Sequence, residues 1–406
     1  MEQAVIWICS AIEELAKTAY QANGVYQRAS YSPEDNAGLA LLKEWMANRS
    51  MSTYFDMVGN LFGRIEGKET STVLIGSHRD TVKNGGKYDG ALGLISSIAA
   101  AGSLYSEFGK PVKTVEVVAT CEEEGSRFLS GYIGSRAIIG ELHDQCLDEK
   151  DSSGKSLKTV LKEYGYYEGN ILTQKENIER FVELHIEQGP ILEEKGEKIG
   201  LVASIVGLLC GSVTFYGMQN HAGTTPMNLR QDPVPYMCQF ITKMHDWVKP
   251  FSHNMVFTVG NINITPGAAN VIAESAEITF DIRSNICELI NDAEKMLAMI
   301  AQSIIEDSNG KINIDIHKAR KDMPVEMDKE GIAMLEAIAE KRDTNCIILN
   351  SGAGHDSQII GKKVKANMIF VPSVNGISHS ADEYTRDTDI ELGYSILKDF
   401  LKELAW

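Results

Sequence analysis

The pattern of apolar and polar positions predicts three buried strands in the first half of the chain, each ending in polar side chains. Apolar runs at residues 73–75 and 115–119 and in the segment FVELH stop abruptly. His78, the acids Glu122 to Glu124, and His185 stand at or just beyond these three ends. In open α/β folds, ligands collect beyond the carboxyl ends of strands, so we expect these side chains to project into one crevice.

The pattern changes from Ile199 onward. The segments IGLVASIVG and CGSVTFYGM alternate like paired strands, and further alternating runs and two helical runs follow as far as KINIDIH. The order strand, helix, strand, strand, helix, strand is that of a ferredoxin-like unit. We therefore predict an inserted α+β domain over residues 212–324, with residues 1–211 and 325–406 forming the other domain.

Helical patterns and further strands complete this other domain, which is predicted to be α/β. A helix is expected from Pro33 to about Asn48, with Ser32 as its cap, and another from Ala91 to Leu104. The polar region over residues 142–175 predicts only short helices and loops. Strands near residues 346–349 and 368–371 lead into the loops SGAGHDSQ and NGISHSADEYT, and the second loop contains His379.

Composition narrows the class of protein. The chain has 406 residues, 43% of them hydrophobic, which suits two folded domains. Its formal net charge is −17 and no run of Lys or Arg interrupts it, so we expect no nucleic-acid partner. No apolar stretch approaches the length of a membrane span, so we expect no membrane partner. Seven scattered cysteines without a CxxC pair are typical of a reduced, cytoplasmic protein.

Five of the side chains predicted at strand ends form a mixed nitrogen and oxygen ligand set. They are His78, Asp89, Glu124, His185 and His379. Such a set suits Zn²⁺, Mn²⁺ or Co²⁺ and not a thiolate site. Two metal ions about 3.5 Å apart can share one carboxylate, and Asp89 is the best candidate to bridge them.

Two neighbouring acids complete the predicted chemistry. Asp80, two residues after His78, is a natural partner for the second ring nitrogen of that imidazole. Glu123, beside Glu124, stands where a general base would take a proton from water. Two divalent ions bring four positive charges and the two ligand carboxylates cancel two, so the site admits an anionic substrate.

Seven motifs in one order carry a resemblance to a known family. They are GSHRDTV…KYDG, EEEGSRF, ELHIEQGP, NHAGTTPM, NVI…DIR, SGAGHD and MIFVPS…GISHS. Together they resemble the dimetal amidohydrolases that include allantoate amidohydrolase, N-carbamoyl-L-amino-acid hydrolase and β-ureidopropionase, within the aminoacylase/carboxypeptidase-type metallopeptidase superfamily. The resemblance covers the chain from about Tyr31 to its end. It implies a mixed-sheet catalytic domain with an inserted lid that forms a homodimer.

The resemblance also implies roles for matching residues. His78 and His185 would hold one ion, Glu124 and His379 the other, with Asp89 between them. Glu123 would act as the base, and Asp80 would orient His78. The lid would complete the site of the partner subunit. The substrate-binding residues would be Gln188 and His221 at the ureido group, Asn270 and Arg283 at the substrate carboxylate, and His355.

Some of these residues have a simpler alternative. His221 and Asn270 are also compatible with ordinary turns, and Arg283 with a surface position on a strand. His355 either contacts substrate or only shapes the pocket. Arg79 and Lys83 are charged where the family leads us to expect apolar residues, and they either favour a more anionic substrate or face solvent.

The expected reaction is hydrolysis of a ureido C–N bond in a small anionic substrate, with release of ammonia and CO₂. The motifs EEEGSRF and SGAGHDSQ most resemble those of enzymes that act on allantoate, whereas IGSRAIIGEL resembles those that act on N-carbamoyl amino acids. An aminoacylase or dipeptidase would use the same metals on an amide. A metal-free binding protein would be expected to lack a ligand or Glu123, and none is missing.

Overall fold

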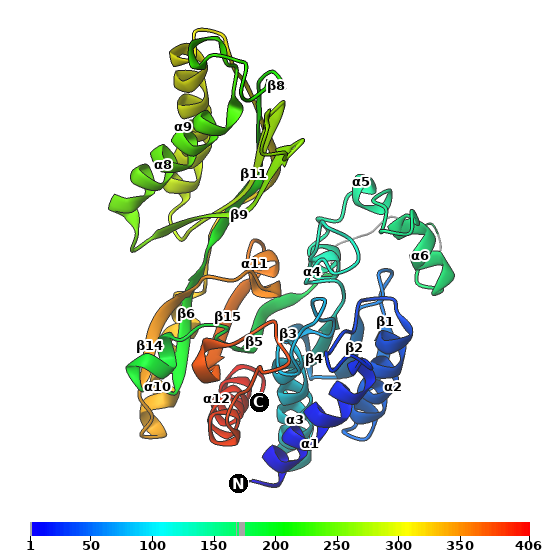
Figure 1. Cartoon of the computed structure of the whole chain (residues 1–406). Coiled ribbons are helices and arrows are strands. Elements are labelled where there is room, and N and C mark those ends of the chain that lie inside the picture. Colours follow the sequence, from blue (N-terminus) through cyan, green and yellow to red (C-terminus); the bar gives the residue numbers. More distant parts are fainter. Residues whose placement is uncertain (1, 168, 170–174) are drawn as a thin grey trace. The chain divides into compact units, whose positions relative to one another are not determined.

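The computed structural model describes residues 2–167, 169 and 175–406, which form two compact units. Unit 1 comprises the residues up to Ala203 together with Glu326–Trp406, and unit 2 comprises Ser204–Val325. The predicted boundary at residue 212 lies in the middle of a strand, β7 (Gly207–Tyr216). Unit 2 begins earlier than predicted, at Ser204. Figure 1 shows the elements of both units in sequence colours.

Unit 1 is built on a nine-stranded mixed sheet, as the predicted fold class requires. The strand order is β1 (Ser52–Phe55), β2 (Leu61–Ile65), β4 (Lys113–Thr120), β3 (Glu69–His78), β5 (Ile178–Ile186), β15 (Lys365–Val371), β6 (Ile199–Ile205) and β13 (Val325–Glu326), with β14 (Cys346–Ser351) paired to β6. The four neighbours β4, β3, β5 and β15 run parallel. Their carboxyl ends therefore meet at one edge of the sheet, as the sequence predicted.

Ten α-helices are described in unit 1. They are α1 (Gln3–Ala19), α2 (Pro33–Ala47), α3 (Ala91–Phe108), α4 (Ile133–Ile138), α5 (Asp144–Leu147), α6 (Leu157–Glu163), α7 (Ile191–Lys195), α10 (Lys329–Lys341), α11 (Asp356–Ile360) and α12 (Asp387–Ala405). Helix α2 begins as predicted, because the Ser32 hydroxyl accepts a hydrogen bond from the Asp35 N–H. The short helices α5 and α6 fall in the polar region over residues 142–175, where residues 168 and 170–174 lie outside the described part.

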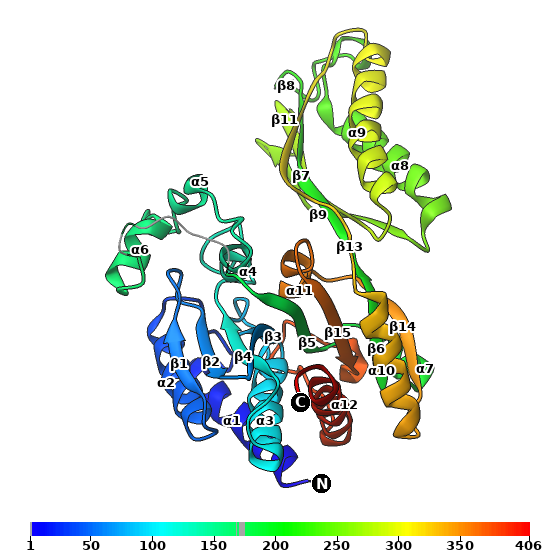
Figure 2. The ribbon, with the colours of Figure 1, turned by 180° about the vertical axis from the view of Figure 1, so that it is seen from behind.

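Helix α3 is the central helix of unit 1. It contacts β3, β4 and β5 and packs against α1 and α12, an arrangement that Figure 2 shows from behind. By length and composition it would be long and apolar enough to cross a membrane, which the sequence analysis did not recognise, but 67% of its apolar window is buried. This burial identifies α3 as a core helix.

Unit 2 has the predicted ferredoxin-like topology. Its elements are β7, β8 (Asn220–His221), α8 (Pro233–Val248), β9 (Met255–Thr265), β10 (Val271–Ile272), β11 (Ser275–Ser284), α9 (Cys287–Asp307) and β12 (Asn313–Asp322). The antiparallel sheet has the order β12-β7-β11-β9. Strands β6 and β7 do not pair with each other, contrary to prediction: β6 belongs to the mixed sheet and β7 pairs with β11 and β12.

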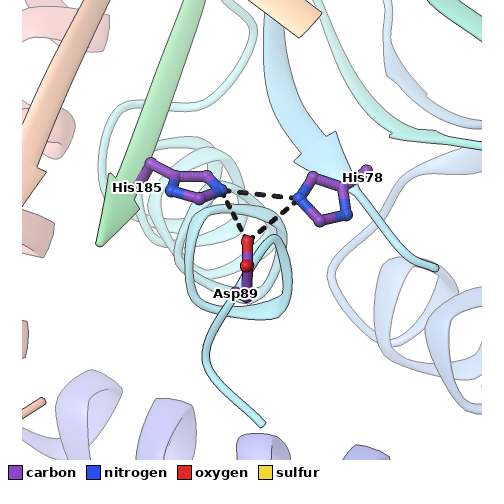
Figure 3. Close-up of side chains that lie close together, drawn as sticks. All are labelled: His78, Asp89 and His185. Carbon is purple, nitrogen blue, oxygen red and sulfur yellow. Dashed lines mark hydrogen bonds and ion pairs between the residues drawn. The ribbon is translucent and has the colours of Figure 1, made fainter. Parts of the chain in front are cut away.

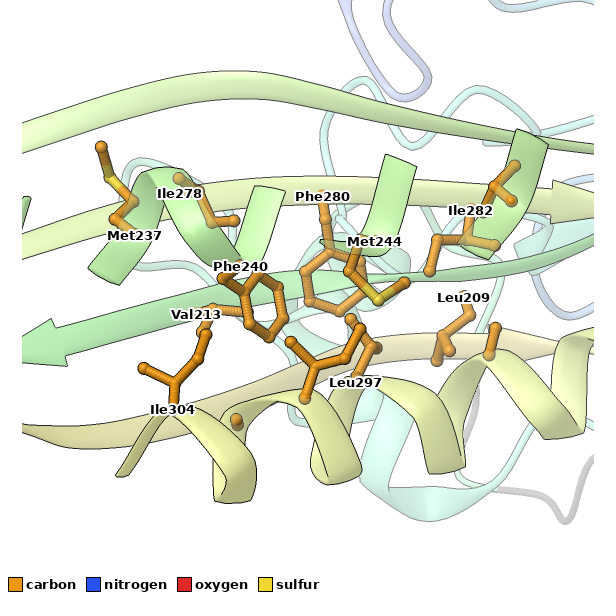
Figure 4. Close-up of a cluster of buried hydrophobic side chains, with 14 of the residues drawn as sticks. Leu209, Val213, Met237, Phe240, Met244, Ile278, Phe280, Ile282, Leu297 and Ile304 are labelled. Carbon is orange, nitrogen blue, oxygen red and sulfur yellow. The ribbon is translucent and has the colours of Figure 1, made fainter. Parts of the chain in front are cut away.

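The core of unit 2 lies between its sheet and two helices. Helices α8 and α9 contact each other and the sheet, and Figure 4 shows Phe240 and Met244 of α8 against Phe280 and Ile282 of β11. These four side chains are at most 3% exposed. The alternation predicted for β11 follows from this burial, since every second residue faces the helices.

Candidate metal centre

The first group of candidate ligands lies at the ends of β3 and β5. The His78 and His185 Nε2 atoms are 3.4 Å apart, and they lie 3.2 and 3.1 Å from Asp89 Oδ1 (Figure 3). Donors placed about 2.0–2.1 Å from one Zn²⁺ at tetrahedral angles are separated by about 3.4 Å. The three side chains are therefore spaced as ligands of a single cation would be.

The second group shares Asp89. The Asp89 Oδ2 atom lies 3.1 Å from His379 Nε2, which in turn lies 3.8 Å from Glu124 Oε2. Ligand atoms of Asp89, Glu124 and His379 all lie within 4.8 Å of one another. The two oxygens of Asp89 thus face different donor groups, which is the arrangement that a bridging carboxylate requires.

The donor set fits a pair of cations. Asp89 Oδ1 and Glu124 Oε1 are buried and have no hydrogen-bond partner among the described residues, although two imidazole nitrogens lie close to the first. A buried carboxylate oxygen without a donor is costly unless a cation occupies the space that it faces. Mixed imidazole and carboxylate ligands are those that Zn²⁺ and Mn²⁺ accept.

Backbone carbonyls orient the two buried imidazoles. The His78 Nδ1 atom lies 2.9 Å from the Asp80 carbonyl oxygen, and His185 Nδ1 lies 2.9 Å from the Ile186 carbonyl oxygen. Each Nδ1 therefore carries the proton and each Nε2 is free to bind a cation. The Asp80 carboxylate was expected to do this for His78, but its Oδ1 is 4.0 Å from Nδ1.

The Asp80 carboxylate instead supports the acidic turn after β4. It accepts hydrogen bonds of 3.2 Å from the N–H groups of Glu123 and Glu124. Glu122 adopts a left-handed backbone conformation with φ of 54°, and its Oε1 accepts 2.6 Å bonds from the Arg127 and Phe128 N–H groups. The first acid of the EEE motif thus closes the turn that presents the other two.

A glycine keeps the Asp89 loop against His78. Gly90 has a φ of 66°, a conformation that residues with side chains rarely adopt. A Cβ atom at this position would lie 2.6 Å from His78 Cε1 and Nδ1. Only glycine therefore allows Asp89 to approach the imidazole, directly before the start of α3.

The buried acids around the centre share one electrostatic feature. Burial is the largest cause that raises the pKa of the carboxyl groups of Asp80, Glu122, Glu123, Glu124, Glu183, Asp356 and Glu383. For Glu124, burial and then the charge of Asp89 raise the pKa to about 8. Bound cations would favour the ionised forms, so this concentration of buried acids is a second reason that the centre suits metal ions.

Asp89 departs from this trend. Burial would raise its pKa, but the imidazoles of His185, His379 and His78 close to its two oxygens hold the pKa well below its usual range. Asp89 is therefore the carboxylate that stays ionised, as a shared ligand must.

Gln188 lies beside the second donor group. Its Nε2 donates a 2.8 Å hydrogen bond to Asp89 Oδ2 and lies 3.3 Å from His379 Nε2. Both Gln188 and His379 adopt left-handed backbone conformations, with φ of 58° and 53°. Such conformations cost free energy and concentrate at functional sites.

His355 lies behind the centre. Its side chain is 1% exposed, its Nε2 lies 2.9 Å from the Ser351 hydroxyl, and its ring centroid lies 4.6 Å from that of His185. This burial does not support the predicted contact with substrate. Of the two roles left open, shaping the pocket agrees better with the structure.

Arg79 and Lys83, the two charged residues that the family resemblance did not lead us to expect after β3, have different environments. Arg79 is 1% exposed, and its guanidinium group contacts the Asp35 carboxylate through bonds of 2.7 and 3.1 Å. It therefore neither faces solvent nor adds charge at the entrance, contrary to both expectations. Lys83 is exposed.

Of the three candidate residues of unit 2, His221 and Asn270 lie in adjacent segments and Arg283 lies apart from them. Val271 pairs with His221 across β8 and β10, and the Ala222 N–H donates to the Asn270 carbonyl oxygen, so these two segments are adjacent. Arg283 stands near the other end of β11, paired with Leu208. It lies eight positions along the strand from Ser275, the first residue of β11, or about 27 Å. A clamp made by Asn270 and Arg283 of the same copy is therefore not formed.

His221 is exposed and held in one orientation by its own loop. Its Nδ1 accepts hydrogen bonds of 3.0 and 3.2 Å from the N–H groups of Gly223 and Thr224. An imidazole that accepts at Nδ1 carries its proton at Nε2. His221 therefore presents a hydrogen-bond donor away from the loop.

Glu383 and Ser378 were not singled out in the sequence, although both lie in the loop that carries His379. Glu383 is buried and its carboxylate contacts the backbone of the Asp89 loop. The sequence feature that could have indicated Glu383 is its position, since it is an acid four residues after the predicted ligand His379.

Comparisons with known proteins agree with this geometry. A model of Peptidase family M20/M25/M40 matches residues 74–403. Allantoate amidohydrolase of Escherichia coli (strain K12) is 39% identical over 404 residues, covering 98% of both chains. N-carbamoyl-L-amino-acid amidohydrolase of Pseudomonas sp. (strain NS671) is 35% identical, covering 95% of both chains. The crystal structure of an amidase of the hydantoinase/carbamoylase family from Burkholderia multivorans superposes with a TM-score of 0.89 at 28% identity, covering 98% of this chain and 97% of that one.

Proposed function

The chain belongs to peptidase family M20/M25/M40, and from this membership we propose that it hydrolyses the ureido C–N bond of allantoate. The observation that carries the proposal is the position of Asp89 between two donor groups, one containing His78 and His185 and the other containing Glu124 and His379. The similarity to two allantoate amidohydrolases, at 39% and 37% identity over nearly the whole chain, supports allantoate as the substrate.

We propose that the five residues hold two divalent ions, Zn²⁺ or Mn²⁺, with Co²⁺ as a further choice. When bound, the ions would polarise the ureido carbonyl and increase the acidity of a water molecule. This assistance matters because two nitrogens donate electrons into a ureido carbonyl and make it a poor electrophile.

Glu123 is proposed as the general base. It directly precedes the candidate ligand Glu124, is 7% exposed, and has a ligand atom within 4.8 Å of those of His78 and Glu124. From there its carboxylate would accept a proton from water and then return it to the leaving nitrogen. Water adds to the carbonyl, the C–N bond breaks, and the resulting carbamate gives CO₂ and ammonia, which leaves an amine product.

The substrate contacts are proposed from both units. The Gln188 amide would bind the ureido group. The donor that His221 presents at Nε2 suits an oxygen that becomes negative in the transition state, and the Arg283 guanidinium suits a carboxylate.

A homodimer follows from the same proposal. His221 and Arg283 lie toward opposite ends of the sheet of unit 2, and about 27 Å of strand is longer than a small substrate. One copy cannot place both residues on one molecule of allantoate. We therefore propose that unit 2 serves as the lid and dimerisation domain and that two copies share each site.

An alternative substrate is supported by one specific observation. Three N-carbamoyl-L-amino-acid amidohydrolases are 33–35% identical to the chain, only slightly less than the 37–39% of the two allantoate amidohydrolases. Both substrates contain a ureido group and a carboxylate, so the same centre would act on either.

Substrate assays on the metal-loaded protein test the proposal. After chelation and addition of Mn²⁺, ammonia release is measured with allantoate and with an N-carbamoyl-L-amino acid, and release of the free amine with an N-acetyl-L-amino acid. We expect the highest kcat/KM with allantoate. A higher value with the carbamoyl substrate would replace the assigned substrate, and activity on the acetyl substrate alone would overturn ureido hydrolysis.

A further inference from the structure

The Glu383 carboxylate joins the two loops that meet at the shared ligand. Its Oε1 accepts hydrogen bonds from the N–H groups of Tyr88 and Asp89 at 2.8 and 3.0 Å. Its Oε2 accepts a 2.8 Å hydrogen bond from the hydroxyl of Ser378, the residue before His379. One buried side chain therefore fixes the backbone of Asp89 and the segment that carries His379.

A glycine far away in the sequence makes room for this carboxylate. A Cβ atom at Gly86 would overlap the carboxylate group and the Cβ of Glu383. The Gly86 backbone has no positive φ, so the need for glycine here arises from the close approach of Glu383. Gly86 and Glu383 are thus two parts of one contact between the loops.

The contact bears on the second donor group more than on the first. His78 and His185 are buried in strands and are each oriented by a backbone carbonyl. His379 is 48% exposed and lies in a loop, and the hydroxyl of the adjacent Ser378 also lies 3.4 Å from Asp89 Oδ2. The second donor group therefore depends on how the loop is held.

We propose that Glu383 is a positioning residue that sets the geometry of the second metal site, formed by Asp89, Glu124 and His379. The carboxylate acts through the backbone of Tyr88 and Asp89 and through Ser378, and it does not itself contact substrate. This inference rests on the proposed dimetal centre. Residues that hold metal ligands in place typically contribute about 10–100-fold to metal affinity.

Metal titration of the full-length protein tests this role without an activity assay. Metal-stripped protein is titrated calorimetrically with Mn²⁺, which gives the number of ions bound and the affinity of each step. We expect Glu383→Gln to weaken the second step by about 10–100-fold and to change the first step by less than about threefold. Gln keeps the size of the side chain and one oxygen for the two backbone N–H groups, but it loses the charge and puts an NH₂ donor where Oε2 accepts from the Ser378 hydroxyl.

The neighbouring Asp382 provides a matched control. Asp382 is exposed, and the substitution Asp382→Asn removes one negative charge from the same loop, as Glu383→Gln does. We expect this variant to bind both ions like the wild-type protein. Equal second-step affinities for Glu383→Gln and Asp382→Asn would overturn the inference.

A second pair of variants keeps the test decisive if Glu383→Gln does not fold. Gly86→Ala should displace the Glu383 carboxylate and weaken the second step in the same range, and Ser378→Ala should weaken it less. Where Glu383→Gln does fold, the effects in the double variant Gly86→Ala/Glu383→Gln should not add, because both changes remove one contact. Additive losses, or a Gly86→Ala protein with wild-type affinities, would contradict the inference.

The titration also separates this inference from the proposed function. A wild-type protein that binds no more than one ion would overturn both. A wild-type protein that binds two ions but hydrolyses none of the three substrates would overturn the function only, and the response of the second step to Glu383→Gln would still decide the role of Glu383.

Discussion

The two units hold their candidate residues in opposite ways. In unit 1, His78, Asp89 and His185 are at most 4% exposed, and other parts of the same sheet and its loops fix each of them. In unit 2, His221 and Asn270 are exposed, and Arg283 is 37% exposed and paired with Asp281. The first set is organised by the fold itself, whereas the second set is organised only by its own loop or strand.

This difference separates chemistry from recognition. A buried donor group costs free energy when one member is removed, because the remaining polar atoms lose their partner. An exposed residue that is supported locally is replaced at little cost in stability. Substitutions in unit 1 should therefore affect metal binding, turnover or folding, and substitutions in unit 2 should affect kinetics while the protein stays folded and loaded.

The largest effect is expected within unit 1, where one residue should separate turnover from metal binding. Glu123→Gln removes the proposed base but keeps the volume of the side chain. We expect kcat to fall by at least about 10²–10⁴-fold, with the metal content measured by mass spectrometry unchanged. Retained activity would remove Glu123 from the mechanism, and loss of metal would assign it to the ligand set.

The next test asks whether unit 2 takes part in the chemical step at all. His221→Ala removes the donor that the loop presents at Nε2. If this donor stabilises charge in the transition state, kcat should fall by about 10²–10³-fold, with the thermal midpoint unchanged.

The control for this test is His245→Ala, which removes an exposed imidazole from α8 of the same unit. It should retain wild-type kinetics. If the two variants behave alike, the contribution of unit 2 would be limited to binding or assembly.

A smaller effect is expected for recognition. Arg283→Ala should raise KM for allantoate by about 10–100-fold, because a charge-assisted hydrogen bond contributes about 1.5–3 kcal/mol. The value of kcat should change little. Steady-state kinetics would show this separation, and an unchanged KM would contradict the assignment.

Arg320→Ala is the matched control for this variant. Arg320 lies on β12 of the same sheet and pairs with Asp322 two residues on, as Arg283 pairs with Asp281. Removing it should leave KM near the wild-type value. A similar rise in KM for both variants would indicate that general charge, and not a specific contact, attracts the substrate.

The same contrast explains what the sequence revealed. Strand ends are visible as abrupt changes from apolar to polar residues, so the positions of His78, Glu124 and His185 followed from β3, β4 and β5. The ferredoxin-like order of unit 2 was visible because its strands alternate and its helices are long. His379 joined the predicted ligand set because its loop follows the strand expected near residues 368–371, although the loop itself has no regular pattern.

Other features depend on contacts between distant segments and were not predictable. His78 is oriented by the backbone carbonyl of Asp80 and not by its carboxylate, and this depends on the direction that the backbone takes after β3. The burial of Arg79 depends on Asp35, which is 44 residues away. The pairing of β6 with β15 and not with β7 depends on which distant strand the chain brings beside β6. The separation of Asn270 from Arg283 follows from strand register, which no motif encodes.

The donor groups come from positions as far apart in the chain as 78 and 379. Two bound metal ions would therefore act as a cross-link between the first and last parts of unit 1. Ligands that bind only the folded state stabilise it by mass action, by about 1.4 kcal/mol for each tenfold excess over the dissociation constant. A cell short of the metal would then lose the protein as well as its turnover, since proteases remove chains that unfold. Metal supply would in this way affect the abundance of the protein.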